Sequence, residues 1–470
     1  MPWPTRALQA AAILLISLIF SSIWIGPLPN NDDLLYAHVV RGVLEGHLWP
    51  LHFGPNPFVA KPPLFFWSTA LGVSVLGDHE AGFRSTSFLA LSFILLLAYK
   101  KYREKPYIAF IVMILCMGSP MLMDLSRRVM LDLPLTAAGL WALYYAQKIF
   151  EGGKVWPFFF LCALGWGLKE IAFLPFMAGP LLGLLCFKKG RQALWNPWAL
   201  MSLALCVAIL GVLFWQQPTL HISQSLARAA DASATGLNAP WTSYWHALRE
   251  ESPLVLATPL ALIWAIFQKN AGLTLMLFTW VFSALAVSAV DLKLPHYLAP
   301  LIALSLYAWG DFLKDSRKPL IVATLAALAV IQGFKTQWLL WEPDSFYMHW
   351  GRSTYELSQT LRKHLSRGAH TCAVNAYPVG FSFYTGYPML GFYTSDKAYA
   401  TVNAVSEFQG MIFRISTEEL PEVASRCAWH LVGPSAYFEK YPELFRILHS
   451  VNLLSVARIL RPDETQDPAP

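Results

Sequence analysis

The chain opens with the apolar run ALQAAAILLISLIFSSIWIG at residues 7–26, and two adjacent aspartates, Asp32 and Asp33, follow it closely. A run of this length crosses the hydrocarbon core of a bilayer as one helix. It lacks a small-residue cleavage site, so we expect a retained helix rather than a removed signal peptide. Carboxylates at the end of a membrane helix are costly unless they contact water, a cation or a substrate. Asp32 and Asp33 therefore mark a first place to look for function.

The composition of the whole chain is that of a membrane protein. Apolar residues make up 56% of the 470 residues and charged residues only 14%, whereas a soluble domain carries about 25% charge. The 19 Trp and 18 Tyr suit aromatic belts at the membrane surfaces, and we expect contacts with membrane lipids. The basic residues behind the net charge of +6 are dispersed, so we expect no nucleic-acid partner.

Further apolar runs of spanning or near-spanning length recur along the chain. They predict a mainly α-helical, polytopic transmembrane bundle of about 11 spans, within a range of roughly 10–13. With the first run, they are residues 7–26, 81–99, 107–121, 133–150, 155–168, 171–187, 198–215, 254–267, 273–289, 297–312 and 320–334.

The distribution of Lys and Arg predicts how the bundle is oriented. With the N-terminus placed in the cytoplasm, short basic connections such as residues 100–105 and 188–191 fall on the cytoplasmic side. The two long connections, residues 27–80 and 216–253, are poor in Lys and Arg for their length and fall on the outer side. We therefore expect a multi-pass protein with a cytoplasmic N-terminus and an outer C-terminal part.

The character of the chain changes after its last apolar run. Residues 1–340 form the predicted transmembrane domain, and its outer loops at 27–80 and 216–253 are expected to hold juxtamembrane helices. Residues 341–461 are more polar, with short strand-like runs broken by Gly and Pro, and predict a small α/β domain on the outer face. Residues 462–470 are polar and contain proline, which is typical of a disordered tail.

Cys372 and Cys427 are the only cysteines of the predicted α/β domain. An oxidising outer compartment would permit them to pair. Two unrelated buried thiols remain the alternative, because sequence spacing does not fix the geometry that a disulfide needs. No spacing of Cys and His in the chain resembles a structural zinc site.

Charged residues at the ends of the apolar runs gather on the predicted outer side. They are Asp32 and Asp33, Lys61, Arg127 with Arg128 and Asp132, Lys169 with Glu170, and Asp291 with Lys293. Each group alone has a simpler explanation, such as an interfacial lysine for Lys61, a helix N-cap for Asp132 or a solvated turn for Lys169. The predicted topology does not depend on these groups. Their occurrence on the same side of the membrane therefore predicts one polar site at the outer membrane boundary.

Carboxylates beside lysines and arginines suit an anionic substrate that is joined to an apolar chain. A lipid phosphate that carries a transferable group fits this description. One aspartate would take the proton of an attacking hydroxyl while the cations stabilise the leaving phosphate. The chain has no P-loop and no Gly-rich nucleotide motif, so we expect a lipid-linked donor.

Five motifs in order resemble the GT-C class of polytopic glycosyltransferases, in particular the branch with protein O-mannosyltransferases and the bacterial aminoarabinose transferase of lipid A. They stand here as DDLLYA at 32–37, AKPPL at 60–64, MLD at 130–132, GLKE at 167–170 and KLPHYLAP at 293–300. The resemblance implies an inverting transfer, in a bacterial inner membrane, of a sugar from a polyprenyl-phosphate donor to a lipid, glycan or protein acceptor.

The resemblance also implies roles for individual residues. Asp32 takes the catalytic or acceptor-orienting position, Asp33 the second acidic position, and Asp132 supports the first loop or the acceptor. Lys61 is expected to contact the donor phosphate. The remaining candidates are Lys169, Arg128 and Arg228 for the donor phosphate, and Tyr36, Tyr297, His296, Lys293 and His221 for the cavity. For Arg228, a solvated residue in a flexible loop remains the alternative.

The chain departs from the family pattern in several places, including the threonine that the family has before the lysine of its Gly-Leu-Thr-Lys-Gly turn, which is missing at 167–170. Ala60 stands where the family has a glutamate that can help to hold a metal ion. A divalent metal is therefore possible but disfavoured, and no other cofactor is predicted. Glu170 stands where the family has a glycine, and Leu35 where some relatives carry a basic residue. Recognition of the donor therefore differs from that of the aminoarabinose enzyme, and lipid A is not assigned as the acceptor.

Two other functions are compatible with the composition. A transporter or flippase of lipid-linked sugars would need charges deep inside helices or broken helices in repeated halves, and the chain shows no internal repeat. A membrane scaffold that binds a partner would leave the ordered motifs unexplained. Transfer requires Asp32, Lys61, Asp132 and Lys169 to converge on one cavity.

Overall fold

A computed structural model describes thirteen segments of the chain, and its contacts divide the chain into two compact units. The described residues are 3–24, 26–28, 32–58, 60–214, 241–267, 270–289, 294–315, 319–341, 346–366, 368–376, 378–395, 411–451 and 453–460. We call Met1–Ile25 with Val59–Trp341 the helical unit, and Gly26–Phe58 with Glu342–Pro470 the sheet unit.

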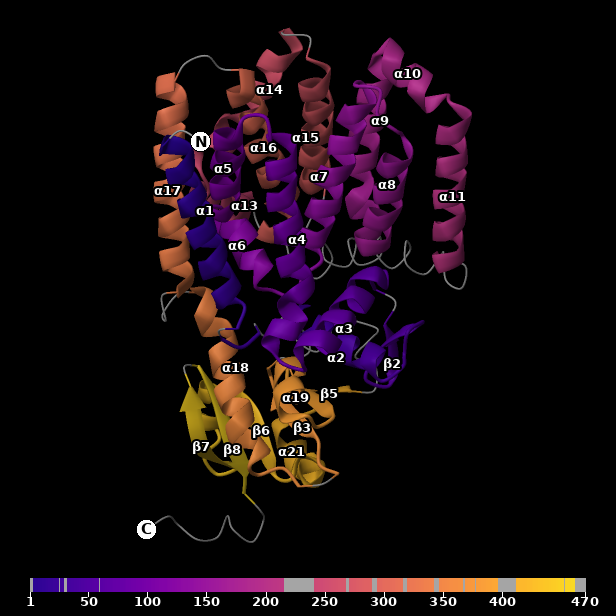
Figure 1. The fold of residues 1–470 in the computed structure, drawn as a ribbon. Coiled ribbons are helices and arrows are strands. Elements are labelled where there is room, and N and C mark those ends of the chain that lie inside the picture. Colours follow the sequence, from indigo (N-terminus) through magenta and orange to yellow (C-terminus); the bar gives the residue numbers. More distant parts are fainter. Residues whose placement is uncertain are drawn as a thin grey trace. The chain divides into compact units, whose positions relative to one another are not determined.

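The helical unit is a bundle, and Figure 1 shows its helices in sequence colours. Its elements are α1 (Trp3–Ser22), α3 (Leu64–Leu76), α4 (Glu80–Lys101), α5 (Pro106–Met117), α6 (Pro120–Ser126), α7 (Asp132–Ile149), α8 (Trp156–Lys169), η1 (Glu170–Phe173), α9 (Leu174–Cys186), α10 (Lys188–Leu194), α11 (Pro197–Phe214), α13 (Trp241–Glu250), α14 (Pro253–Phe267), α15 (Ala271–Ala289), η2 (Pro295–Leu298), α16 (Ala299–Asp315) and α17 (Pro319–Trp341).

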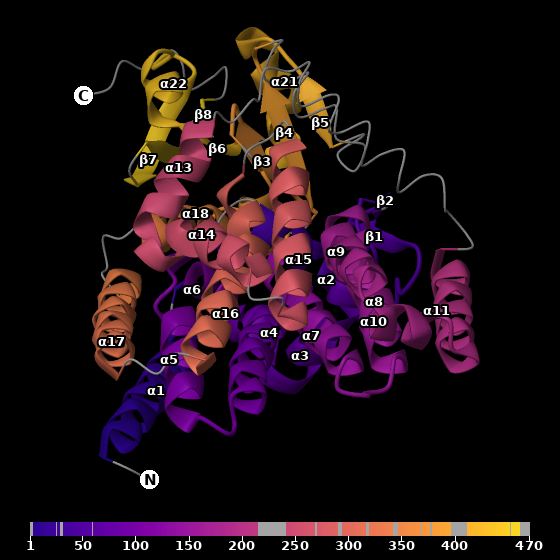
Figure 2. The same ribbon diagram turned by 90° about the horizontal axis from the view of Figure 1, so that it is seen from above.

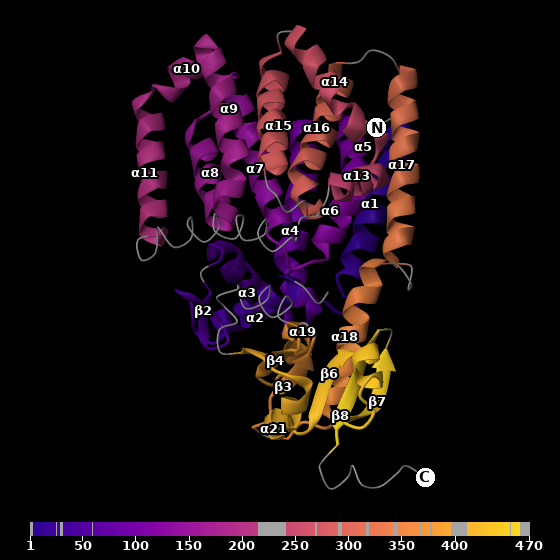
Figure 3. The same ribbon diagram turned by 180° about the vertical axis from the view of Figure 1, so that it is seen from behind.

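Small residues let the helices of the bundle approach closely. Gly139 of α7 lies against Phe176 of α9, and Gly179 of α9 lies against the backbone of Thr279 of α15. Such contacts are typical of helix packing in membranes, where close van der Waals contact replaces the hydrophobic effect. Figure 2 shows α4, α7, α15 and α16 as neighbours within the bundle, and Figure 3 shows α11 at its rim beside α8.

Only some of the described helices have the length and composition expected of membrane spans. Three stretches are long and apolar enough, by length and composition, to cross a membrane: Glu80–Lys101, Ala271–Ala289 and Trp156–Cys186. The last of these comprises α8, η1 and α9. The pair α5 and α6, bent by 72° at its break, would make a fourth. Three further apolar helices are shorter: Arg6–Ser22, Leu64–Leu76 and Pro197–Ala208. The count of about 11 spans stays a prediction.

The chain reverses direction between α8 and α9. Residues eight apart in one continuous helix are separated by about 12 Å, yet a Cβ on Gly165 would lie 2.1 Å from the ring of Phe173. The ring of Phe187, which follows α9, packs against Phe150, which precedes α8, with centroids 5.3 Å apart. The two helices are therefore antiparallel neighbours, and the reversal falls at the turn between Lys169 and Glu170.

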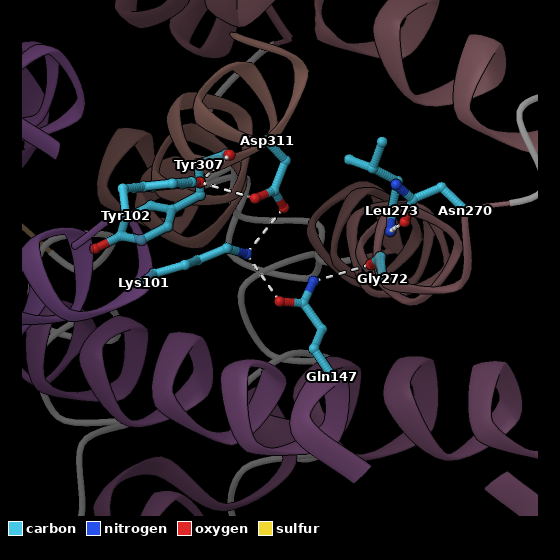
Figure 4. Close-up of polar contacts among 8 residues, drawn as sticks. All are labelled: Lys101, Tyr102, Gln147, Asn270, Gly272, Leu273, Tyr307 and Asp311. Atoms are coloured by element: carbon cyan, nitrogen blue, oxygen red, sulfur yellow. Dashed lines mark hydrogen bonds and ion pairs between the residues drawn. The ribbon is translucent and has the colours of Figure 1, made fainter. Parts of the chain in front are cut away.

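A polar network joins four helices at one end of the bundle (Figure 4). Lys101 Nζ donates to Asp311 Oδ2 and to Gln147 Oε1, both at 2.8 Å. Gln147 Nε2 donates to the carbonyl oxygen of Gly272 at 2.9 Å, and the hydroxyl of Tyr102 donates to Asp311 Oδ1 at 3.1 Å. The network lies at the C-terminal ends of α4, α7 and α16 and the N-terminal end of α15, and it fixes these helices against one another.

Replacing Asp311 by Ala should lower the free energy of unfolding by about 3 kcal/mol, because it leaves the largely buried ammonium of Lys101 without its anion. The side chains of Lys101 and Asp311 are only 11% and 15% exposed. Thermal unfolding of the purified protein in detergent measures the effect. Glu151→Ala is the control, because its partner Lys148 and Glu151 are 39% and 64% exposed; equal losses in the two variants would contradict the prediction.

The sheet unit contains one six-stranded sheet, a two-stranded hairpin and several helices. Its elements are α2 (Asp32–Leu44), β1 (Leu51–Phe53), β2 (Asn56–Phe58), α18 (Phe346–Arg362), β3 (Thr371–Val374), α19 (Val379–Thr385), β4 (Met389–Tyr393), β5 (Ile412–Arg414), η4 (Thr417–Glu419), α21 (Leu420–Val423), η5 (Ala424–Cys427), β6 (His430–Pro434), α22 (Ser435–Glu439), β7 (Phe445–Val451) and β8 (Leu454–Ile459). The strand order is β5-β4-β3-β6-β8-β7. The small C-terminal α/β region predicted from sequence is present.

The sheet has a parallel and an antiparallel part and is covered on both faces. Strands β5, β4, β3 and β6 are parallel, while β8 is antiparallel to β6 and β7. Neighbouring residues of a strand point to opposite faces: Ala373 packs with Leu357 and Leu361 from the α18 region, and Cys372 packs with Phe438 and Leu420 on the other face.

The N-terminal segment of the sheet unit packs on α19. His38 Nε2 lies 3.2 Å from the carbonyl oxygen of Val379. The guanidinium of Arg41 donates to the carbonyl oxygen of Phe383 at 3.0 Å and stacks on its ring at 3.9 Å. Residues 27–58 thus pack with the sheet unit. No local sequence pattern reveals these contacts, because they join parts of the chain more than 300 residues apart. The predicted domain boundaries stay a prediction.

Candidate active site

An ion pair between two helix ends forms the centre of the site in the helical unit. Asp132 is the first residue of α7 and Lys169 the last residue of α8. Lys169 Nζ donates to Asp132 Oδ1 at 2.6 Å, and the side chains are 13% and 4% exposed. Each charge complements the dipole of its own helix. The alternative of Asp132 as a helix N-cap is wrong, since Leu131 takes that position and no side chain caps the helix.

Asp132 stays ionised despite its burial. Burial by itself would raise the pKa of Asp132, but its interactions with Lys169, His296 and Lys61, of which that with Lys169 is the largest, lower it on balance. This contribution to stability is present above the pKa of an unfolded aspartate and is lost as the pH falls through the lower pKa of the folded state. The site therefore keeps a fixed negative charge at neutral pH.

His296 and Tyr297 extend the site from the segment that precedes α16. Burial is the largest cause that lowers the pKa of His296 to about 4, and the charges of Lys169, Arg128 and Lys61 act in the same direction while Asp132 opposes them. The imidazole is therefore neutral at physiological pH. The ring of Tyr297 lies 5.0 Å from Lys169 Nζ and perpendicular to the ring of His296, with centroids 4.6 Å apart.

Lys61 belongs to the same site. Its charge acts on Asp132, Glu170 and His296. The segment that follows Lys61 lies against the end of α8, where a Cβ on Gly167 would be 3.5 Å from Leu64. Lys61, Asp132 and Lys169 thus lie in one region of the helical unit. Asp32 belongs to the sheet unit, so the convergence of all four residues on one cavity stays a prediction.

Arg128 lies at the edge of this site. Its guanidinium is 3.4 Å from Asp124 Oδ2, and its charge acts on His296. The predicted donor-phosphate candidates Lys61, Lys169 and Arg128 therefore share His296 as a common neighbour.

The two aspartates of the first loop belong to the sheet unit. Asp32 and Asp33 occupy the first turn of α2, where carboxylates complement the helix dipole. Asp33 is fully buried, whereas Asp32 is partly accessible. Tyr36 is also buried, with its ring 6.4 Å from that of Phe58. The structure thus separates the pair into an accessible and an enclosed carboxylate.

Three of the predicted site residues, His221, Arg228 and Lys293, lie outside the described residues. Within the described part of the chain, no group of three or more His, Cys, Asp or Glu lies together as a metal site would need. Ala60 is buried and offers no ligand. The expectation that a divalent metal is disfavoured stays a prediction.

The structure joins Cys372 and Cys427 in a disulfide, with Cα atoms 5.6 Å apart. The bond ties β3 to η5 on one face of the sheet. Both sulfurs are buried, so the pair belongs to the core of the sheet unit.

Glu251, which lies before α14, is a buried carboxylate that no sequence pattern indicates. It is 6% exposed, and its Oε1 accepts hydrogen bonds from Ser119 Oγ at 3.0 Å and from the backbone N–H of Met121 at 2.9 Å. Glu251 thus caps α6 at the bend after α5. Its neighbour Glu250 is exposed, and nothing in the sequence distinguishes the two.

We expect the stability of the protein to depend on the ionisation of Glu251. Burial raises the pKa of Glu251 from 4.5 to about 7, so the stability it contributes is full below about pH 4.5 and lost as the pH rises through about 7. Glu251→Gln keeps the acceptor and should gain on the order of 3 kcal/mol over wild type at pH 8, with little difference at pH 4. Thermal unfolding across this pH range tests it, with Glu250→Gln as the control; parallel curves for wild type and Glu251→Gln would contradict it.

Comparison with known proteins supports the resemblance that the motifs indicate. Residues 60–215 match the family described as dolichyl-phosphate-mannose-protein mannosyltransferase. The undecaprenyl phosphate-alpha-4-amino-4-deoxy-L-arabinose arabinosyl transferase of Pseudomonas savastanoi pv. phaseolicola is 26% identical over 63% of this chain and 58% of that protein. A protein of the same name, numbered 2, from Pseudomonas fluorescens is 25% identical over 66% of this chain and 58% of its own length. The match thus spans less than two thirds of these relatives.

Two solved structures share the fold. They are the crystal structures of ArnT from Cupriavidus metallidurans, in the apo state and bound to undecaprenyl phosphate. The first has a TM-score of 0.67 at 15% identity and covers 96% of this chain and 98% of that one. The second has a TM-score of 0.68 at 14% identity and covers 99% and 100%. The predicted resemblance to GT-C glycosyltransferases is confirmed, and the fold is that of a polytopic membrane protein.

Proposed function

We propose that the chain is an inverting glycosyltransferase that moves a sugar from a polyprenyl-phosphate donor to a lipid, glycan or protein acceptor. The convergence of Lys61, Asp132 and Lys169 carries this proposal, because it places cations beside a fixed carboxylate within the region that matches the mannosyltransferase family. Relatives named for an undecaprenyl-phosphate sugar, and the likeness to a structure bound to undecaprenyl phosphate, support it.

The donor phosphate binds to Lys61, with Lys169 and Arg128 as further cations. As the bond between the anomeric carbon of the sugar and the phosphate oxygen breaks, its electron pair goes to the phosphate, and these cations stabilise the developing charge. Lys169 is held by Asp132 while it does so. His296 is neutral, so the positive charge at the phosphate comes from the lysines and Arg128 and not from the imidazole.

Asp32 takes the proton of the attacking acceptor hydroxyl, and the acceptor oxygen forms the new bond to the anomeric carbon on the face opposite the phosphate. The configuration at that carbon therefore inverts. Asp32 suits this role because its carboxylate is partly accessible, whereas Asp33 is enclosed and supports the first turn of α2. A general base of this kind accelerates a reaction by about 10²–10⁴-fold.

The proposed setting is a bacterial inner membrane, crossed by about 11 spans, with the N-terminus in the cytoplasm and the sheet unit on the outer side. The basic connections at residues 100–105 and 188–191 support this orientation. A flippase of lipid-linked sugars is the alternative, and the transferase names of the relatives count against it.

Mass spectrometry of envelope lipids, glycans and proteins, from cells with and without the active chain, tests the function. We expect a sugar that is present on one acceptor only when the wild-type chain is present, and absent with Asp32→Asn. Movement of a lipid-linked sugar across the membrane without any modified acceptor would instead favour the flippase.

A further inference from the structure

The backbone of Glu170 has a conformation that a glutamate rarely adopts. Its φ is 29° and its ψ is −118°. Within the described part of the helical unit, it is the only residue other than glycine with a positive φ. Such a conformation costs a side-chain-bearing residue stability that a glycine would not lose. A glutamate at this position therefore needs a reason outside the backbone.

The turn itself does not need a glutamate. The chain must reverse between α8 and α9, since Gly165 packs against Phe173, and a positive φ at residue 170 accomplishes the reversal. A glycine would do this without strain. The side chain of Glu170, rather than its backbone, must explain why a glutamate occupies the turn.

The side chain of Glu170 lies in the site already described. It is 6% exposed. Burial raises the pKa of Glu170, and the positive charge of Lys61 opposes that rise by favouring the carboxylate. The contact of Gly167 with Leu64 brings this turn to the segment that follows Lys61. Adjacent residues of one turn therefore interact with different groups: Lys169 binds Asp132, and Glu170 lies within the electrostatic reach of Lys61.

We propose that Glu170 is a positioning residue that holds the ammonium of Lys61 where the donor phosphate binds, a role that rests on the proposed function. Lysine has a flexible four-carbon side chain and loses considerable rotamer freedom when it is fixed. A carboxylate fixed by a rigid turn reduces that loss before the lipid phosphate arrives. Ala60 supplies no acidic group beside Lys61, so the turn supplies it.

The proposal predicts that Glu170→Gln affects binding of undecaprenyl phosphate differently when Lys61 is present and when Lys61 is replaced by Ala. With Lys61 present, Glu170 organises the phosphate site, so Glu170→Gln should weaken binding of undecaprenyl phosphate about fivefold. With Lys61→Ala, the carboxylate only repels the phosphate, so adding Glu170→Gln should leave binding unchanged or strengthen it. The four proteins form a double-mutant cycle that isolates the coupling of the two residues.

The experiment measures binding of undecaprenyl phosphate to the purified full chain in detergent. Glu151→Gln, an exposed glutamate paired with Lys148, controls for loss of a carboxylate and should leave the Kd unchanged. Equal weakening by Glu170→Gln in both backgrounds would show a merely structural role and overturn the proposal. Tighter binding by Glu170→Gln with Lys61 present would show simple repulsion and overturn it too.

The strain at Glu170 gives a second readout. Glu170→Gly and Glu170→Gln both remove the charge, but only the glycine relieves the backbone, so the glycine variant should unfold about 3 °C higher than the glutamine variant while both bind equally weakly. A wild-type protein that binds no undecaprenyl phosphate, or a Lys61→Ala variant with unchanged Kd, would overturn the proposed donor site itself. Intact wild-type binding with no coupling would overturn only the role of Glu170.

Discussion

Replacing Asp32 by Asn should abolish sugar transfer, with kcat lower by at least about 10³-fold, because an amide cannot accept the proton of the attacking hydroxyl. The folded state should survive. Asn has the same shape, and the loss of one carboxylate from the first turn of α2 costs only about 0.5 kcal/mol through the helix dipole. The measurement is the rate of sugar transfer by the purified variant, together with its unfolding temperature.

Two matched variants separate catalysis from folding. Glu45→Gln removes an exposed carboxylate that follows the same helix and should leave both transfer and stability unchanged. Asp33→Asn removes a fully buried carboxylate and should lower the unfolding temperature, because partners of a buried charge lose their counter-charge. Full turnover in Asp32→Asn would remove Asp32 from the catalytic role and leave Asp132 as the remaining candidate.

The sequence predicts where helices lie along the chain better than it predicts which elements pack against one another. The run at residues 81–99 appears as α4 and that at 273–289 as α15, since apolar runs of this length are local signals. The packing of α2 on α19 has no such signal, because His38 meets Val379 across 341 positions. Charge distribution predicted that Lys169 and Asp132 share a side, but it did not show that they form one ion pair.

Glu170 and Glu251 are examples of burial that the sequence does not indicate. Both read as polar residues at helix ends, yet both are buried. Their burial follows from the turn between α8 and α9 in one case and from the bend between α5 and α6 in the other, and neither is encoded in residue spacing. A glutamate where the related family has a glycine was the one sign available, and it becomes informative only once φ at that position is known to be positive.

Replacing Lys61 by Ala should weaken binding of undecaprenyl phosphate about 100-fold, because a hydrogen bond between charged groups contributes about 1.5–3 kcal/mol. The unfolding temperature should fall less than in Lys169→Ala, because Lys61 is only partly buried, although its loss also removes the positive charge that acts on the buried Glu170. Lys61→Arg should restore part of the affinity, as it keeps the charge but changes its geometry. Binding of undecaprenyl phosphate to the purified variants measures the effect, and Lys363→Ala, at an exposed position of the sheet unit, is the control.

Lys169→Ala should behave differently, and the difference distinguishes a phosphate ligand from a structural cation. Its loss leaves Asp132, whose side chain is 4% exposed, without its partner, which should cost about 3 kcal/mol of stability as well as affinity. If Lys61→Ala destabilised the protein as much as Lys169→Ala and left the affinity unchanged, Lys61 would be a structural residue. If Lys61→Ala lowers the affinity but costs less stability than Lys169→Ala, the donor phosphate binds on the Lys61 side of the Asp132–Lys169 pair, next to the turn that carries Glu170.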